Sequence, residues 1–208
     1  MEIIKIKKMK RGCLITIIIV AFFALIILGA VLWGVKVNNN MVTMQEKVKS
    51  QWGNVETQYQ RRADLIPNFV NTVKGAANFE QETLTKVIEA RAKATQVTLD
   101  PTKMTAENMK QFQAAQSELS SSLSKLMVVV EQYPELKATQ NYRDLQVELE
   151  GTENRISVER RNFNDVAQSF NAYIKRFPES FIAGMRGFTE RPYFLSMEGA
   201  DKAPQVTF

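Results

Sequence analysis

The hydrophobic pattern along this chain of 208 residues changes sharply near its start. Residues 14–35 form an apolar run of 22 residues without a charged side chain. As a helix rising about 1.5 Å per residue, this run is long enough to cross a hydrocarbon core of about 30 Å. Because only a helix satisfies its own backbone hydrogen bonds within lipid, the run predicts a transmembrane helix.

A cleaved signal peptide is the alternative interpretation of this run. The apolar region of a signal peptide is about 7–15 residues long and ends in a small-x-small cleavage site. The run here is longer, and its small residues Gly29 and Ala30 are followed by large apolar side chains. We therefore favour a retained anchor with Trp33 near its far end, since an indole lies favourably at a membrane interface.

Beyond the apolar run, hydrophobic residues recur every three or four positions, which is the period of one helix face. This spacing predicts four helices, over residues 41–75, 79–97, 106–133 and 142–177. No alternating pattern typical of a strand competes with them. The predicted fold is therefore all-α, with one N-terminal transmembrane helix followed by an elongated antiparallel four-helix bundle over residues 41–177.

Details of the four helices follow from the same pattern. The asparagines at 38–40 form either a loop or a continuation of the helix, and Pro67 either kinks the first bundle helix or begins a new one capped by Asp64. Thr105 is the expected cap of the third helix. The apolar face of the second helix is expected to comprise Leu84, Val87, Ile88, Ala90 and Ala94. That of the fourth helix is expected to run from Tyr142 to Phe177.

The C-terminal tail, residues 178–208, is rich in aromatic side chains. The summed helix lengths return the chain close to its starting level, so the tail is expected near the membrane. It is either a flap over the end of the bundle or an element that contacts the membrane or another subunit, because aromatic side chains favour each setting. The candidates for membrane-proximal contacts are Trp33, Phe181, Phe188, Tyr193 and Phe194.

Charge is distributed unevenly. Residues 1–13 hold five basic side chains and one acidic one, whereas the remainder holds 22 basic and 21 acidic side chains. The basic segment predicts a cytoplasmic N-terminus, a single-pass topology and a bundle on the outer face of the membrane. In a bacterium this is the periplasmic or extracytoplasmic side of the inner membrane. The near-neutral remainder lacks the basic excess that nucleic-acid binding requires, so membrane lipids are the expected contact and nucleic acid is not.

The chain contains no histidine and one cysteine, Cys13. Histidine-dependent triads, histidine-ligated zinc and multi-cysteine metal sites are therefore excluded, and we expect no cofactor and no enzymatic activity. Carboxylate chemistry and a Ser-Lys nucleophile remain as alternatives, the latter because Ser120, Ser121 and Ser122 lie close in sequence to Lys125. A solvated helix face explains this spacing more simply.

Charged residues also fall close to the predicted apolar faces. Arg62 lies between Tyr59 and Ile66 on the first bundle helix, and a buried arginine needs a carboxylate partner. We interpret these charges as a structural ion-pair network that fixes helix register, rather than as a catalytic or anion-binding site. The candidate members of the network are Arg61, Arg62, Asp64, Glu153 and Glu159.

Several segments, in chain order, resemble the signature of the LemA family. They are Arg61–Val70 (RRADLIPNFV), Val73–Gly75, Tyr133–Ala138 (YPELKA), Glu153–Ile156, Arg160–Arg161, Phe163–Asn164, Phe170–Asn171, Phe177–Pro178, Gly187–Phe188 and Tyr193–Phe194. The resemblance implies a membrane-anchored helical bundle in a bacterial envelope, and it implies no reaction. It also associates the chain with proteins that form internal membrane compartments and with envelope proteolysis or stress.

Two functions fit these observations. The first is a non-enzymatic, membrane-anchored envelope protein that forms a homo-oligomer and organises or remodels the inner membrane. The second is an adaptor that binds a partner protein in envelope proteolysis or the stress response. An anchor, a long rigid bundle and an aromatic tail near the membrane favour the first.

Overall fold

The computed structural model describes residues 11–75 and 80–195. Within these residues the chain is helical and forms no strand, as the sequence predicts. The helices are α1 (Arg11–Lys74), α2 (Gln81–Gln96), α3 (Ala106–Val130), α4 (Pro134–Lys137), α5 (Gln140–Lys175) and α6 (Glu179–Arg186). The first ten residues of the predicted basic segment and residues 196–208 of the predicted tail lie outside the described part.

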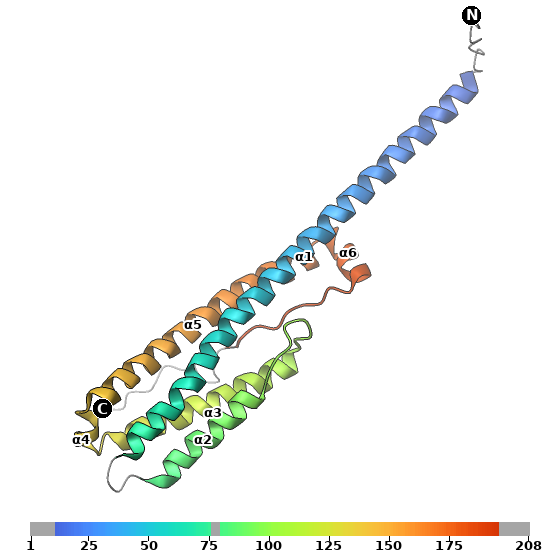
Figure 1. The fold of residues 1–208 in the computed structure, drawn as a ribbon. Coiled ribbons are helices and arrows are strands. Elements are labelled where there is room, and N and C mark those ends of the chain that lie inside the picture. The colour runs from blue at the N-terminus through green and yellow to red at the C-terminus, as the bar shows by residue number, and fades with distance from the viewer. Residues whose placement is uncertain (1–10, 76–79, 196–208) are drawn as a thin grey trace, which may run out of the picture.

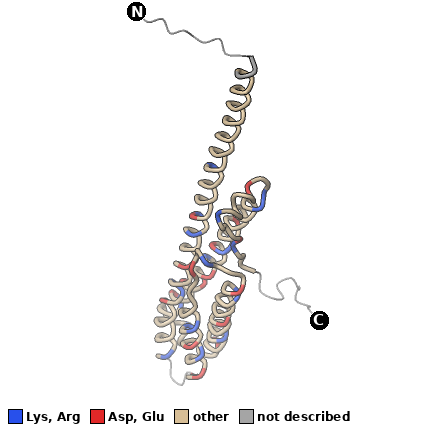
Figure 2. The backbone as a smooth tube through the Cα atoms, turned by 90° about the vertical axis from the view of Figure 1, so that its right-hand side faces the viewer, with Lys and Arg blue, Asp and Glu red and all other residues tan. Residues whose placement is uncertain are grey.

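Helix α1 joins the apolar run to the rest of the molecule without interruption. Its 64 residues form a rod about 96 Å long at the usual helical rise. The asparagines at 38–40 continue the helix and form no loop. Residues 14–35 project beyond the other helices with their side chains largely exposed, and this part of the chain carries no charge (Figures 1 and 2). It is long and apolar enough to cross a membrane.

Pro67 lies inside α1 and does not end it. Proline lacks the backbone N–H that would bond to the carbonyl oxygen four residues earlier, which here belongs to Ala63. The guanidinium of Arg91 on α2 replaces that donor, since its Nε donates to the Ala63 oxygen at 2.7 Å. The backbone group released by Pro67 is thereby satisfied by a neighbouring helix, and the contact ties α2 to α1.

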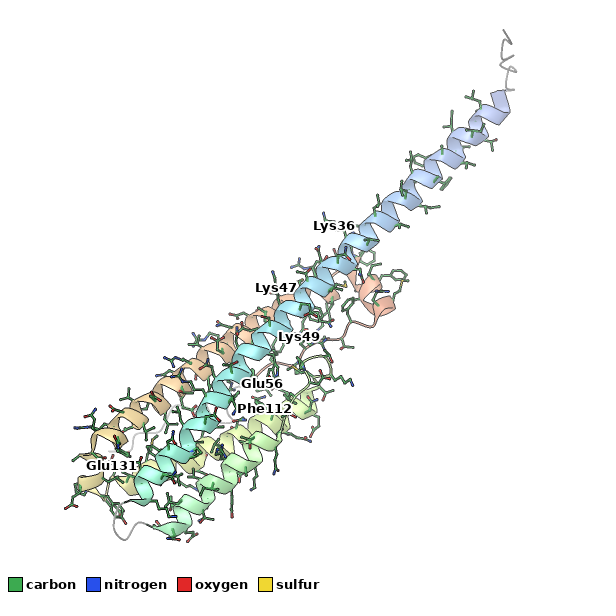
Figure 3. All side chains as sticks on the ribbon, in the orientation of Figure 1. Lys36, Lys47, Lys49, Glu56, Phe112 and Glu131 are labelled. Carbon is green, nitrogen blue, oxygen red and sulfur yellow. The ribbon has the colours of Figure 1, made fainter. Side chains whose placement is uncertain are left out.

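The second half of α1 packs along α5, and α2 and α3 form a helical hairpin beside this pair (Figure 1). We call residues 37–75 together with residues 80–195 the helical body. Its core has two parts. The part nearer the apolar run, which we call the membrane-proximal core, includes Trp52, Phe112, Phe163 and Phe170. The part farther from the run, which we call the distal core, includes Phe69, Leu126 and Leu149. Figure 3 shows Lys36 where the free part of α1 reaches the helical body and Glu131 at the opposite end.

The local predictions are mostly confirmed. Thr105 caps α3 in a reciprocal capping box with Asn108. On α2, four of the five side chains expected to face inward are buried, but Ile88 is exposed and that prediction is wrong. Phe177 is 89% exposed because α5 ends at Lys175, two residues before it, so its assignment to the apolar face is also wrong. The short helix α4 was not predicted.

After α5 the chain forms α6 and then an extended segment, Gly187–Leu195, which we call the C-terminal strap. Gly187 ends α6 with a φ of 73°, a left-handed conformation that glycine adopts without steric cost. The strap returns along the helical body (Figure 1). Its Phe194 ring stacks on Trp52 at 6.0 Å and meets Phe163 edge-on at 5.5 Å. The strap thus forms part of the membrane-proximal core.

The Ala63–Arg91 contact predicts that the stability cost of replacing Arg91 depends on whether Pro67 is present. Arg91→Ala should lower the free energy of unfolding by about 1–3 kcal/mol, because it leaves the Ala63 carbonyl without a donor. In a Pro67→Ala background the restored backbone N–H bonds to that carbonyl, so the same substitution should cost much less. Urea unfolding of the four variants in detergent, followed by circular dichroism, measures the difference.

Lys86→Ala is the matched control on α2, since Lys86 is exposed and pairs with Glu82 on the same helix. It should change stability by less than about 0.5 kcal/mol in both backgrounds. Equal losses for Arg91→Ala with and without Pro67 would contradict this account of the proline.

Candidate functional site

Arg62 is the most deeply buried charged side chain among the described residues. It belongs to α1 and is 1% exposed. Its Nη1 donates to Glu153 Oε1 on α5 at 2.5 Å and to Ser120 Oγ on α3 at 2.8 Å. The Arg62 guanidinium also lies over the Tyr59 ring, 5.2 Å from its centroid. One cation therefore connects α1, α3 and α5.

Gln116 extends this network to α2. Its Oε1 accepts a hydrogen bond from Arg62 Nη2 at 2.5 Å, and its Nε2 donates to the carbonyl oxygen of Ala94 at 3.1 Å. The buried amide thus uses both ends of its side chain. We call these side chains the Arg62 network: Tyr59, Arg62, Gln116, Ser120 and Glu153. They come from α1, α3 and α5, and α2 joins them through the Ala94 carbonyl oxygen.

The other predicted ion-pair residues are placed differently. Asp64 is exposed and accepts a hydrogen bond from Gln60 at 2.8 Å. Glu159 is half-buried and accepts one from Gln51 at 2.5 Å, which joins α5 to α1. Arg61 is exposed on α1. Of the three carboxylates that the sequence offered to Arg62, the structure brings Glu153 to it.

The polar side chains around Arg62 are engaged in contacts within the protein. Burial raises the pKa of Tyr59, so its hydroxyl stays protonated beside Arg62. Ser120 is engaged by Arg62, and Ser122 donates to a backbone carbonyl of its own helix, whereas Lys125 is exposed. Within residues 11–75 and 80–195 no group of three or more acidic, cysteine or histidine side chains is arranged to hold a metal ion.

Two asparagines on α5 hold the C-terminal strap, and the sequence analysis gave them no role. Asn164 and Asn171 lie seven residues apart, on the same side of the helix. Asn171 accepts from the Arg191 N–H and donates to its carbonyl oxygen, both at 2.8 Å. Asn164 binds the N–H and carbonyl of Phe194 in the same way, at 2.8 and 2.9 Å. The repeated Phe-Asn pairs, 163–164 and 170–171, were the sequence signal for this arrangement.

Two arginines complete the attachment of the strap. Arg160 on α5 lies over the Phe194 ring at 4.8 Å and donates to the Leu195 carbonyl oxygen at 3.0 Å. Arg191 on the strap is 5% exposed and donates to the Thr102 carbonyl oxygen, between α2 and α3, at 3.2 Å. Burial lowers the pKa of Arg191, although a guanidinium remains charged near neutral pH. The strap therefore connects α5 to the α2–α3 hairpin.

The predicted membrane-proximal aromatic residues fall into two groups. Phe188 and Phe194 pack onto the core, and the Tyr193 hydroxyl accepts a hydrogen bond from Asn171 at 3.1 Å. Trp33 on α1 and Phe181 on α6 are exposed, Phe181 by 68%. The structure therefore separates side chains that hold the strap from side chains that face outward near the apolar run.

Comparison with known proteins gives a consistent family assignment. The LemA family model matches residues 51–208. The chain is 26% identical over 186 residues to Magnetosome protein MamQ 1 of Paramagnetospirillum magneticum and to Magnetosome protein MamQ of Magnetospirillum gryphiswaldense, with 81% of this chain and 68% of each relative covered. It is 28% identical over 145 residues to Protein LemA of Metamycoplasma hominis, with 70% of this chain and 63% of the relative covered.

The Arg62 network predicts that Glu153→Gln lowers the free energy of unfolding by about 2 kcal/mol. The substitution keeps the shape of the side chain but leaves the buried guanidinium with neutral acceptors only. Glu150→Gln is the control, since Glu150 lies on the same helix, is exposed and should change stability by less than about 0.5 kcal/mol. Thermal and urea unfolding of the full-length chain measure both. Indistinguishable effects would mean that Gln116 and Ser120 suffice for Arg62.

Proposed function

Because the chain belongs to the LemA family, we propose that it is a non-enzymatic, membrane-anchored envelope protein that self-associates and organises or remodels the inner membrane. The observation that carries this proposal is the exposed apolar half of α1. Its side chains have no protein neighbours to cover them over most of residues 14–35. Apolar surface of this extent needs a bilayer as its solvent.

The continuity of α1 supports a mechanical role. A loop after the membrane span would let the helical body tilt freely, whereas an unbroken helix transmits the orientation of one part to the other. In this proposal the helical body is an antiparallel four-helix bundle that stands on the periplasmic or extracytoplasmic side, with the basic N-terminus in the cytoplasm. Parallel rods confined to one membrane have a high effective concentration, so weak lateral contacts suffice for self-association.

The relatives named as magnetosome proteins also support this function. The alignments with them cover 81% of this chain. The polar contacts of Arg62 and Gln116 join helices to one another, which fits a structural role for this cluster. In this proposal the helical body is a rigid spacer and the surface through which copies contact one another. Membrane lipid is the principal partner of the protein.

A partner-binding adaptor in envelope proteolysis or stress response is the second candidate. The observation that favours it is a hollow of about 730 Å³ at the distal end of the helical body. It is lined by residues that include Thr72, Tyr133, Leu136 and Asn141. It faces away from the membrane and includes the Tyr133–Leu136 part of the family motif. A partner protein on the extracytoplasmic side would reach this end first.

The proposed topology predicts which side of the membrane each thiol faces. In intact spheroplasts, a membrane-impermeant maleimide should label Glu56→Cys in a Cys13→Ser background, because Glu56 is exposed on the helical body (Figure 3). The wild-type chain, whose one cysteine is Cys13, should be labelled only after the cells are opened. The reverse pattern would contradict the topology.

Self-association is tested with the full-length chain in lipid. A photo-crosslinker placed at Val158, which is exposed on α5, should give products whose masses are multiples of the chain in native membranes. The purified protein should also change the shape of liposomes as its density rises. A reproducible crosslink to a different envelope protein would favour the adaptor. A monomeric protein that leaves liposomes unchanged would contradict the first proposal.

A further inference from the structure

Helix α6 lies beside α1 at the end of the apolar run. Arg186 Nε on α6 donates to Asn38 Oδ1 on α1 at 3.0 Å. The Ile182 side chain lies beside Gly34, since its Cδ1 is 3.8 Å from the position that a Cβ at residue 34 would take. Both contacts fall at the boundary between the predicted membrane span and the helical body. Figure 1 shows α6 at this point, on one side of α1.

The two faces of α6 differ in what covers them. Ala183 is buried in the membrane-proximal core, and Ile182 packs partly against it. Phe181 and Met185, four residues apart and therefore on one face, are 68% and 70% exposed. Phe177, just before the helix, is 89% exposed. Three large apolar side chains therefore point away from the protein at the level where α1 leaves the predicted span.

This outward surface continues into the apolar half of α1. A depression of about 380 Å³ between the helices is lined by Val31, Gly34 and Val35 from α1 and by Met185 from α6, among others. Val31 and Val35 belong to the predicted span and need lipid around them. The same lipid therefore reaches the depression and the exposed side of α6.

The charges around α6 favour lipid headgroups over a second copy of the chain. Lys36 follows the span, Arg186 lies beside Asn38, and the Arg176 carbonyl oxygen accepts the Ser180 N–H at the start of α6. All three cations are exposed, whereas Glu179 within α6 is half-buried. Lipid phosphates at this level would complement the cations. A twofold contact between copies would instead bring the same cations together.

We propose that α6 lies in the outer-leaflet interface and inserts Phe177, Phe181 and Met185 at the boundary between headgroups and acyl chains. The anchor then has two parts, the span of α1 and a short amphipathic helix docked against one side of it. Because α6 occupies one leaflet only, it adds area to that leaflet beside each anchor. This inference rests on the proposed membrane orientation and gives the proposed remodelling a specific lipid contact.

Spin labels on the full-length chain in nanodiscs test the proposal. In a Cys13→Ser background, labels at Phe181→Cys and Met185→Cys should be more accessible to oxygen than to a water-soluble nickel chelate. The expected depth is about 5–10 Å below the phosphates. Val128→Cys, on the exposed surface of α3, is the aqueous control, and Val31→Cys is the reference within the span. Circular dichroism confirms that each labelled variant is folded.

The outcomes separate this inference from the proposed function. Nickel accessibility at Phe181 and Met185 equal to that at Val128 would overturn the inference, even if the protein self-associates. Low accessibility of these labels to both oxygen and the nickel chelate would also overturn it, because it would show that protein and not lipid covers this face of α6. Lipid-buried labels in a protein that stays monomeric would support the inference and contradict self-association.

Discussion

The buried guanidinium of Arg62 is the interaction on which the arrangement of the helical body depends. A charge removed from water must be matched by partners placed to within a fraction of an ångström, because leaving it unpaired is costly. Its partners come from α3 and α5, and Gln116 extends the requirement to α2. Apolar packing alone permits neighbouring helices to slide by one turn. We expect the Arg62 network to favour one register, which would explain why an arginine stands where the pattern calls for an apolar residue.

The same short segment of α1 also contains Pro67, through which the helix continues unbroken. Ala63, next to Arg62, offers its carbonyl oxygen to Arg91, and Pro67 makes that oxygen available by removing the usual donor. The proline therefore creates a binding point for α2 rather than a break. Segment 61–70 of the family motif thus combines a buried charge, a released carbonyl and the core side chains Ile66 and Phe69. Each of these features contributes to helix packing.

The sequence predicted the helices well because their evidence is periodic. Spacing of three and four residues located α2, α3 and α5 to within a few residues, and Thr105 was identified as a cap by its residue type. The failures have physical causes. Ile88 fits the apolar spacing but lies at the edge of the face, and no neighbour covers it. The partner of Arg62 could not be chosen among three carboxylates, because helix register is a tertiary property. The strap is extended and has no periodicity, so only the repeated Phe-Asn pairs marked its contacts.

The residues after α5 contribute both to the core and to the exposed surface of the protein. Asn164 and Asn171 bind backbone groups of the strap, so its side chains are free to alternate between the core and the outside. Phe194 takes the buried position beside Trp52. Because the strap is fixed in this way, α6 is held at both ends: by α5 before it and by the strap after it. A helix of eight residues has little stability of its own in water, so its place beside Gly34 depends on these attachments. In the proposed orientation, the core of the helical body would thereby determine where Phe181 and Met185 of α6 meet the membrane.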